Sequence, residues 1–346
     1  MTSPSISVVM GNYNHAHYLT ESIPAILNQT YRPKEFIIID DASTDNSVEV
    51  IEAFAKKDPI IRFYKNKKNL GNALTYVNAI KKVTGDFFLT AAADDLILPQ
   101  LFEKSIRTLE QYPKAAMCNA ISKRIDENGN EQVTSPEPPY ISKEPCFISP
   151  RKALKYFLNG ESWCMLQTGL IRKTALLEVG GYPIEAGEYS DGFTIPLIAL
   201  NYGSCFIPEV LGVYRVLPTS LASKTRSDPQ AFIDRMKNIR ELMKSPRYIE
   251  KFPTSFVEAF YKQALYQTGA IALSNEAISA NQSFTQIDKS FLKWNSLDTF
   301  VLSGFKSLFV IQQFIVKIFL FFKLRKFSWA MIKKIFYRLL INTQNS

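Results

Sequence analysis

Near its start the chain reads Ile6-Ser7-Val8-Val9-Met10-Gly11-Asn12-Tyr13-Asn14, a short apolar run followed directly by a polar loop. Such a run is typical of a strand that is buried on both faces of a sheet. Residues 35–40 and 87–91 are two further runs of this kind, and helical patterns lie between them at about 19–29, 44–57 and 72–82. Strands that alternate with helices predict an α/β fold with a mostly parallel sheet flanked by helices.

The second half of the chain has a different texture. Residues 126–129 carry a turn signal, Asp-Glu-Asn-Gly, and prolines follow it, so residues 119–148 predict a hairpin and a long loop. Residues 191–202 have a helical pattern, and the pattern is helical throughout from about residue 228. We predict two domains, with the sheet in residues 1–220 and a helical C-terminal region in residues 221–346.

The positive charge of the chain is concentrated at its C-terminal end. Of 346 residues, 46% are hydrophobic and 21% are charged, which allows a packed core, and the formal net charge is +9. No acidic residue follows Asp298, whereas eight basic residues do; without those eight, 33 basic residues face 32 acidic ones. A nucleic-acid-binding protein more often spreads basic residues over its folded face, so we expect no nucleic-acid partner.

Residues 303–341 mix these basic residues with Phe, Ile and Leu. No apolar run there reaches the roughly 18 residues of a spanning helix. We predict a basic amphipathic tail that lies on an anionic membrane surface. The N-terminus lacks the pattern of a secretion signal, so we expect a cytoplasmic protein at the inner face of the cell membrane. The alternative for the tail is a helical extension that packs on the body or in a dimer interface.

Polar residues follow each of the three predicted strands. Residues 11–14 follow the first strand, Asp40-Asp41 ends the second, and Asp94-Asp95 lies just past the third. The carboxyl ends of parallel strands meet at one sheet edge, where ligands bind. A diphosphate can approach carboxylates there only with a cation between them, and Mg²⁺ or Mn²⁺ accepts both kinds of oxygen. The alternative is that these residues form only solvated turns and helix caps.

The order and spacing of these segments resemble those of the inverting family 2 glycosyltransferases, which have the GT-A fold. The resemblance extends over about residues 4–218 and rests first on residues 6–14, 22–31 and 39–45. Three further segments are similar to that family: Asn69-Leu70-Gly71, Ala93-Asp94-Asp95, and Gly180-Gly181-Tyr182 followed by Ser190-Asp191. The resemblance implies an enzyme that moves a sugar from a nucleotide diphosphate to a hydroxyl, as in bacterial surface-polysaccharide synthesis.

The resemblance also implies roles for individual residues. The nucleotide-sugar site would consist of Gly11, Asn12, Tyr13, Asp41, Asn69, Gly71 and Asp94. Within it Asp41 would bond the base, uracil by the family pattern, and Asp94 would contact the ribose or the donor sugar. Asp95, in that family's version of the DxD motif, would ligate Mn²⁺ or Mg²⁺. Asp191 would be the catalytic base; its alternative is the N-cap of a helix.

Residues 161–169 lie where members of that family shape the acceptor pocket, so Trp163, Gln167 and Thr168 are expected on the acceptor side. Two roles are open for Trp163, because its ring can stack on a sugar or lie in the core. Residue 215 also has two readings: its guanidinium can face the diphosphate or form a surface ion pair.

The sequence departs from the family pattern at three positions. Gly11 stands where Pro or Thr is common, and Ala93 replaces the first acid of the DxD motif. Leu217 stands where many members have His, which puts a histidine contact to the diphosphate in doubt.

The sequence lacks the motifs that are typical of several other enzyme classes. The chain contains no GxG for a nicotinamide dehydrogenase and no GxxxxGK for a P-loop enzyme. A sugar nucleotidyltransferase would carry a Gly-rich, Arg-containing loop after Met10, and this chain lacks that loop. The four cysteines form no CxxC pair, so their spacing resembles neither a zinc site nor a disulfide framework. The expected partners are therefore a UDP-linked sugar, a glycan or lipid-linked acceptor, and an anionic membrane. The alternative is a non-catalytic, membrane-associated module on a transferase-like fold that binds a nucleotide or a glycan.

Overall fold

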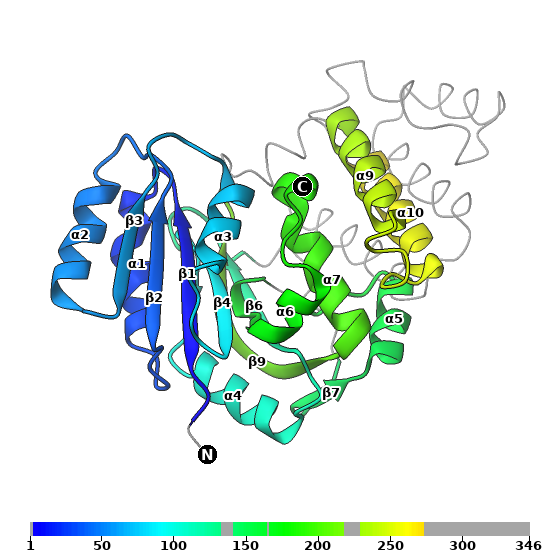
Figure 1. Cartoon of the computed structure of the whole chain (residues 1–346), viewed down its shortest axis with the longest axis horizontal. Coiled ribbons are helices and arrows are strands. Elements are labelled where there is room, and N and C mark those ends of the chain that lie inside the picture. The colour runs from blue at the N-terminus through cyan, green and yellow to red at the C-terminus, as the bar shows by residue number, and fades with distance from the viewer. Residues whose placement is uncertain (1–2, 133–140, 165, 218–228, 273–346) are drawn as a thin grey trace, which may run out of the picture. The chain divides into compact units, whose positions relative to one another are not determined.

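A computed structural model of the chain describes residues 3–132, 141–164, 166–217 and 229–272 (Figure 1). The strands are β1 (Ile6–Asn12), β2 (Glu35–Asp40), β3 (Ile61–Lys65), β4 (Phe87–Ala92), β5 (Leu96–Ile97), β6 (Met117–Ile125), β7 (Cys146–Ile148), β8 (Leu170–Arg172) and β9 (Ser204–Arg215). The helices are α1 (Ala16–Leu27), α2 (Ser47–Lys57), α3 (Asn72–Ile80), α4 (Leu101–Gln111), α5 (Pro150–Leu158), α6 (Lys173–Val179), α7 (Ser190–Tyr202), α9 (Pro229–Lys244) and α10 (Thr254–Ala272). Two short 3₁₀ helices are η1 (Leu166–Thr168) and η2 (Ile184–Tyr189).

The nine strands form one mixed sheet in the order β3-β2-β1-β4-β8-β6-β9-β5, with β7 paired to β9. The four strands from β3 to β4 are parallel to one another. Beyond β4 the sheet is mixed: β8 is antiparallel to both β4 and β6, β6 and β9 are parallel, and β5 and β7 are each antiparallel to β9. The expected α/β fold with a sheet flanked by helices is confirmed, and only the half of the sheet from β3 to β4 is parallel throughout.

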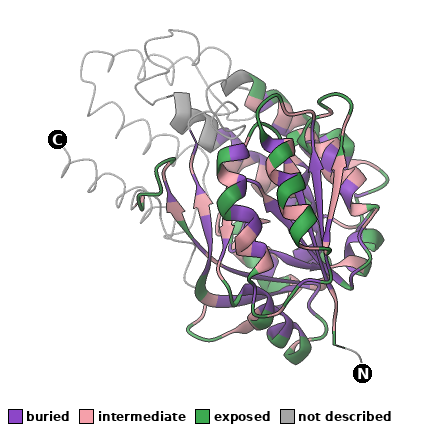
Figure 2. Ribbon diagram, turned by 90° about the vertical axis from the view of Figure 1, so that its left-hand side faces the viewer, coloured by how far each residue is buried: buried purple, intermediate pink, exposed green. Residues whose placement is uncertain are grey.

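Helices cover both faces of the sheet. Ile6, Val8 and Met10 of β1 share one apolar cluster with buried residues of α1, α2 and α4. Side chains alternate along a strand, and a methyl group on Gly11 would meet Thr75 and Tyr76 of α3 on the opposite face. Figure 2 shows the result, with buried strands between helices whose outer faces are exposed. The three-layer packing explains why the first strands are apolar at nearly every position.

Register brings the predicted loops together at one edge. Asn12 at the end of β1 is opposite Asp40 at the end of β2, and Gly11 is opposite Ala92 at the end of β4. All three strands run in the same direction, so the segments that follow them leave the sheet side by side.

The structure differs from the sequence-based expectations in three local features. Strand β3 was not anticipated, although residues 61–65 include Ile61, Phe63 and Tyr64, which are favoured in strands. Helix α2 begins at Ser47 rather than near residue 44. The predicted hairpin is limited in the described residues to a bridge between Ile125 and Glu131, while residues 133–140 lie outside them.

The described residues divide into two compact units, with one unit up to Val216 that omits residues 155–161, and a second that combines those residues with the chain from Leu217. In the second unit, Arg240 of α9 pairs with Glu258 of α10 at 2.7 Å. The expected helical C-terminal region is thus confirmed as far as residue 272. The predicted tail at residues 303–341 lies outside the described residues. Within them, none of the helices combines the length and apolarity needed to cross a membrane.

Candidate active site

Asn12 ties the first two strand ends together. Its side chain is buried, and its Nδ2 donates to Asp40 Oδ2 at 2.9 Å and to Ser43 Oγ at 3.2 Å. The Oδ1 atom of Asn12 is buried and has no hydrogen-bond partner among the described residues. The Asn12 amide therefore fixes the distance between the loops after β1 and β2.

A second set of bonds fixes the loop after β1. Asn14 adopts the left-handed region at φ 55°, and its Oδ1 accepts from the Thr44 N–H at 2.7 Å. The Asn14 N–H donates to Ser43 Oγ at 2.9 Å. The side chain of Tyr13, between these anchors, is 45% exposed. A rigid backbone thus presents an exposed aromatic ring at the edge of the sheet, which suits stacking on a base.

The carboxylate of Asp41 organises the loop that precedes α3. Asp41 is buried; its Oδ1 accepts from Asn66 Nδ2 at 2.7 Å and from the Leu70 N–H at 2.9 Å. Its Oδ2 accepts from the Gly71 N–H at 2.8 Å, and Gly71 has φ 80°. Asp41, Asn69 and Gly71, predicted as parts of one site, are therefore brought together. Sequence reasoning missed Asn66, because that residue directly follows the unanticipated strand β3.

The next carboxylate pair follows β4. Asp94 is partly exposed, whereas Asp95 is buried and its Oδ1 accepts from the Arg215 N–H at 2.8 Å. Burial, and then the charge of Asp94, raise the pKa of Asp95 to about 8. A buried carboxyl group beside a second carboxyl group favours a bound cation or proton.

Arg215 connects this pair to the rest of the unit. Its side chain is 4% exposed, so a surface ion pair does not describe it. Its Nε donates to the Asp94 carbonyl oxygen at 3.1 Å, and one terminal nitrogen donates to Glu21 Oε2 of α1 at 2.9 Å. The guanidinium carbon also lies 4.8 Å from the ring centroid of Tyr18. Arg215 thereby anchors the backbone of the loop that carries both carboxylates.

Asp191 comes from a different part of the chain. It lies in the first turn of α7, whose N-cap is Tyr189, so Asp191 is not the helix cap. Residue 191 as a whole is partly exposed, the Oδ1 of its carboxylate accepts from the Gly192 N–H at 2.6 Å, and burial of the carboxylate raises its pKa. A raised pKa is the property expected of a carboxylate that exchanges a proton near neutral pH.

Tyrosine rings connect Asp191 to the sheet edge. Segment η2, directly before α7, packs on α3. Burial is the main cause that raises the pKa of Tyr182, and the charge of Asp191 adds to it. The pKa of Tyr76 in α3 is raised by burial and then by the charges of Asp94 and Asp95, with Tyr182 also contributing. Tyr182 is thus influenced by the charge of Asp191, and Tyr76 by the charges of Asp94 and Asp95.

The sequence comparisons agree with this arrangement. The profile of the family described as "Glycosyl transferase family 2" matches residues 7–173. The uncharacterised glycosyltransferase MJ1057 of Methanocaldococcus jannaschii is 32% identical over 222 residues, which cover 62% of this chain and 72% of that protein. The chain belongs to glycosyl transferase family 2. It is therefore a glycosyltransferase, as the resemblance implied.

Solved structures share the fold of this glycosyltransferase. Residues 1–349 of S. aureus TarS in complex with UDP-GlcNAc superpose with a TM-score of 0.60 at 15% identity, covering 90% of each chain. The mannosyltransferase PcManGT from Pyrobaculum calidifontis, in complex with GDP-Man and Mn²⁺, has a TM-score of 0.54 at 17% identity and covers 92% of this chain and 88% of its own. At these identities the likeness supports the GT-A fold alone.

The carboxylates of the transferase fit a divalent metal that is shared with a substrate. Among the described residues, no three His, Cys, Asp or Glu side chains gather into a complete metal cluster. Mg²⁺ at phosphate sites is commonly held by one or two carboxylates together with substrate phosphates and water. The Asp94-Asp95 pair is such a donor set. The raised pKa of Asp95 means that its ionised form is disfavoured, and a bound cation would stabilise that form.

The three residues expected on the acceptor side of the transferase are all buried. Trp163 has no exposed surface and donates from its indole nitrogen to Ser204 Oγ at 2.8 Å, so of its two open roles the structure shows the core role. Thr168 is also fully buried, and its Oγ1 donates to the Ala120 carbonyl oxygen at 2.9 Å. Gln167 is 7% exposed. The acceptor-side role of Gln167 and Thr168 stays a prediction.

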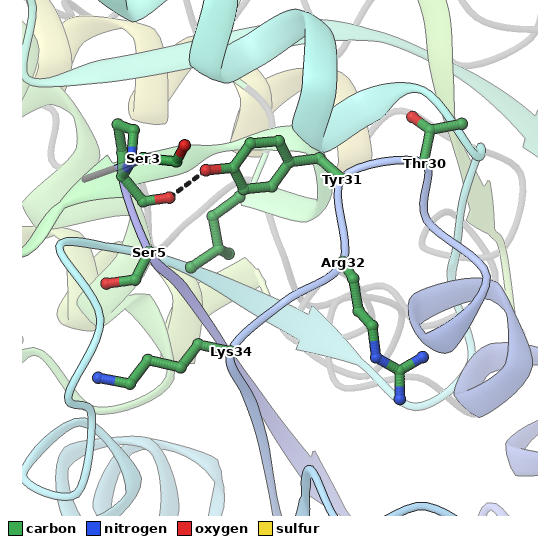
Figure 3. A pocket seen from close by; sticks show the side chains of 8 residues that line it. Ser3, Ser5, Thr30, Tyr31, Arg32 and Lys34 are labelled. Atoms are coloured by element: carbon green, nitrogen blue, oxygen red, sulfur yellow. Dashed lines mark hydrogen bonds between the residues drawn. The ribbon is translucent and has the colours of Figure 1, made fainter. Parts of the chain in front are cut away.

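A pocket lies away from the residues predicted for the active site. It has a volume of about 350 Å³ and is lined by Ser5, Thr30, Tyr31, Arg32 and Lys34, among others (Figure 3). The Tyr31 hydroxyl closes one side by donating to the Pro4 carbonyl oxygen. These segments precede β1 and β2, at the opposite edge from the carboxylates. The pocket is therefore separate from the candidate active site.

Proposed function

We propose that this glycosyltransferase moves a sugar from a UDP-sugar to a hydroxyl of a glycan or lipid-linked glycan in cell-surface polysaccharide synthesis, with inversion at the anomeric carbon. The choice of nucleotide is supported by TarS, a neighbour of the same fold described in complex with UDP-GlcNAc and with UDP. The GDP-Man complex of PcManGT makes a guanosine donor the competing choice.

One observation carries the proposed mechanism: Asp191 has a raised pKa, and the segment η2 directly before it packs on α3, which itself packs on β1. Asp191 accepts the proton of the acceptor hydroxyl while the hydroxyl oxygen bonds to the anomeric carbon. The bond from that carbon to the diphosphate oxygen breaks, and its electron pair leaves with the diphosphate. A single displacement of this kind inverts the anomeric centre without a covalent intermediate.

The loops of the transferase hold the donor. Tyr13 stacks on the base, and Asp41 orients the base and the backbone of Gly71. Asp95, with Asp94 beside it, would hold Mn²⁺ or Mg²⁺; when bound, the ion neutralises charge that builds on the departing diphosphate. Because Asn12 and Arg215 fix these loops before the donor arrives, less ordering is required when it binds.

The same proposal includes peripheral attachment to the inner face of the cell membrane through residues 303–341. Its support is the charge distribution, since all eight basic residues after Asp298 stand without an acidic neighbour. Attachment would hold the active site near a lipid-linked acceptor.

Nucleotide binding tests the donor site. We expect calorimetric titration of UDP, GDP, TDP and CDP, first with Mn²⁺ and then with EDTA, to give metal-dependent binding of UDP above the others. Asp95→Ala should weaken this binding. Preference for GDP would replace the nucleotide, and a folded protein that binds none of the four would refute the donor site.

Turnover tests the catalytic base. We expect Asp191→Asn to retain UDP binding and to lose about 10²–10⁴-fold in donor turnover, the usual contribution of a general base. Glu188→Gln, a neighbouring carboxylate in η2, is the matched control and should keep its activity. The base works only when deprotonated, so wild-type activity should fall as pH drops through the raised pKa of Asp191. Full turnover in Asp191→Asn would contradict this role, and absent turnover in the wild type despite UDP binding would favour the non-catalytic module.

A further inference from the structure

A very small cavity is lined in part by Asp95. Its volume is about 10 Å³, and its wall combines the polar side chains of Ser22, Asp95 and Gln167 with Ile26, Ala91 and Ile97. Ser22 belongs to α1 and Gln167 to η1, so segments that are far apart in the sequence meet at this carboxylate. The polar side chains of this wall are each no more than 9% exposed.

Two polar atoms of this wall have no hydrogen-bond partner among the described residues: Ser22 Oγ and Gln167 Nε2. Leaving a buried donor unbonded costs about 1–3 kcal/mol, so such atoms in native proteins are generally satisfied. The third polar group is the Asp95 carboxylate, which accepts hydrogen bonds and cannot donate when ionised.

One water molecule would satisfy these groups together. A cavity of about 10–15 Å³ is the smallest that holds a water, and a buried water needs two to four polar partners. Water can accept from Gln167 Nε2 and donate to the Asp95 carboxylate, while its remaining sites bond the Ser22 hydroxyl. A dry apolar cavity would offer no such partners.

We propose that Ser22 and Gln167 are positioning residues for Asp95 and act through one enclosed water molecule. The inference rests on the proposed function, in which Asp95 holds a divalent metal. The Arg215 N–H, 2.8 Å from Asp95 Oδ1, fixes the carboxylate from one side. The water fixes it from behind, so a lone pair is directed toward the metal before the metal arrives. Groups that orient a metal ligand typically change metal affinity by about 10–100-fold.

The test measures metal affinity rather than activity alone. We expect Gln167→Leu and Ser22→Ala each to weaken Mn²⁺ binding in the presence of UDP by about 10–100-fold. The concentration of unbound Mn²⁺ is measured from its electron paramagnetic resonance signal. UDP binding in EDTA should stay within twofold of the wild type. Ser122→Ala is the matched control, because Ser122 Oγ is also buried without a partner in the described part of the chain but lies outside this cavity.

The possible outcomes are distinct. Wild-type affinity for Mn²⁺ in both variants would overturn the inference and leave the proposed function intact. A wild-type protein that takes up no Mn²⁺ with UDP would overturn both. A crystal structure provides an independent readout if Gln167→Leu does not fold: a water within hydrogen-bond distance of Asp95 and Gln167 supports the inference, and an empty cavity contradicts it.

Discussion

At the start of β2 the carboxylate of Glu35 is buried and accepts four hydrogen bonds from three segments. Ser7 Oγ donates at 2.6 Å, the Thr84 N–H and hydroxyl donate at 2.7 and 2.8 Å, and Arg62 donates at 2.6 Å. Burial acts to raise the pKa of Glu35, but these bonds outweigh it and the pKa is lowered. A single residue thus fixes the beginnings of β1 and β4 against β2.

The lowered pKa of Glu35 determines in which direction the stability of the protein changes with pH. Because the folded pKa of Glu35 lies below its unfolded value, its stabilisation is present at neutral pH and is lost as pH falls below about 4.5 through the folded pKa. We expect Glu35→Gln to lower the free energy of unfolding at pH 7 by about 1–3 kcal/mol. Urea unfolding at pH 7 and pH 4 checks this, and the mutational loss should shrink at the lower pH. An equal loss at both values would contradict the assignment.

The limits of residue-level reasoning are visible at two site residues. Asp41 was placed correctly at a strand end, but its bonds to Asn66 and Gly71 depend on a loop 25 to 30 positions away. Gln167 was expected near an acceptor because of its position in the chain. Its burial beside Asp95 follows from the packing of η1 behind β4, which no local pattern records.

At the scale of elements, the entry into β4 requires a glycine. The Gly85 N–H donates to Ser7 Oγ at 2.9 Å, and a methyl group at Gly85 would lie 2.8 Å from the Ser7 backbone nitrogen. We expect Gly85→Ala to push β4 from β1 and to lower the free energy of unfolding by about 1–3 kcal/mol, the usual cost of overpacking.

Thermal and urea unfolding measure this effect. Gly11→Ala is the comparison, because a methyl group at Gly11 would meet its nearest neighbour at an ordinary 3.4 Å. The Gly85 variant should be clearly the less stable of the two. Equal stability would show that the β1–β4 contact yields without cost.

The beginning of α2 illustrates why element boundaries moved. Ser43 and Thr44 precede α2 and are of the residue types that cap helices, but their side chains bond Asn14 of the loop after β1 instead. Asp45 Oδ1 accepts from the Ser47 N–H at 3.0 Å, while its Oδ2 accepts from the Ala16 N–H of α1 at 3.0 Å. The helix starts later because tertiary bonds compete for the capping side chains.

At the scale of the whole molecule, charge separates the body from the tail. The body is nearly neutral, and the basic excess follows Asp298, in residues outside the described part. Lys and Arg near an anionic membrane contribute about 1 kcal/mol each, and the attraction is screened over about 10 Å at 0.1 M salt.

We therefore expect the full chain to bind vesicles of phosphatidylglycerol and phosphatidylcholine, and to dissociate from them as salt rises. Replacing Lys333, Lys334 and Arg338 with Gln should reduce binding at least about tenfold. The matched control replaces Lys56, Lys57 and Lys67 of the body with Gln and should change little. Vesicle flotation measures both, and equal losses would contradict tail-specific attachment.

By itself the sequence determined the α/β class, the three central strands and the polar residues at their ends. These follow from local periodicity, because a strand buried on both faces must be apolar throughout, and from the family resemblance. Only the tertiary structure decided that the sheet is mixed beyond β4, that the segment before Asp191 packs on α3, and that Trp163 and Gln167 are buried. Those features depend on which distant segments pack together. The packing involves residues that are far apart in the sequence, and local patterns do not show which of them come into contact.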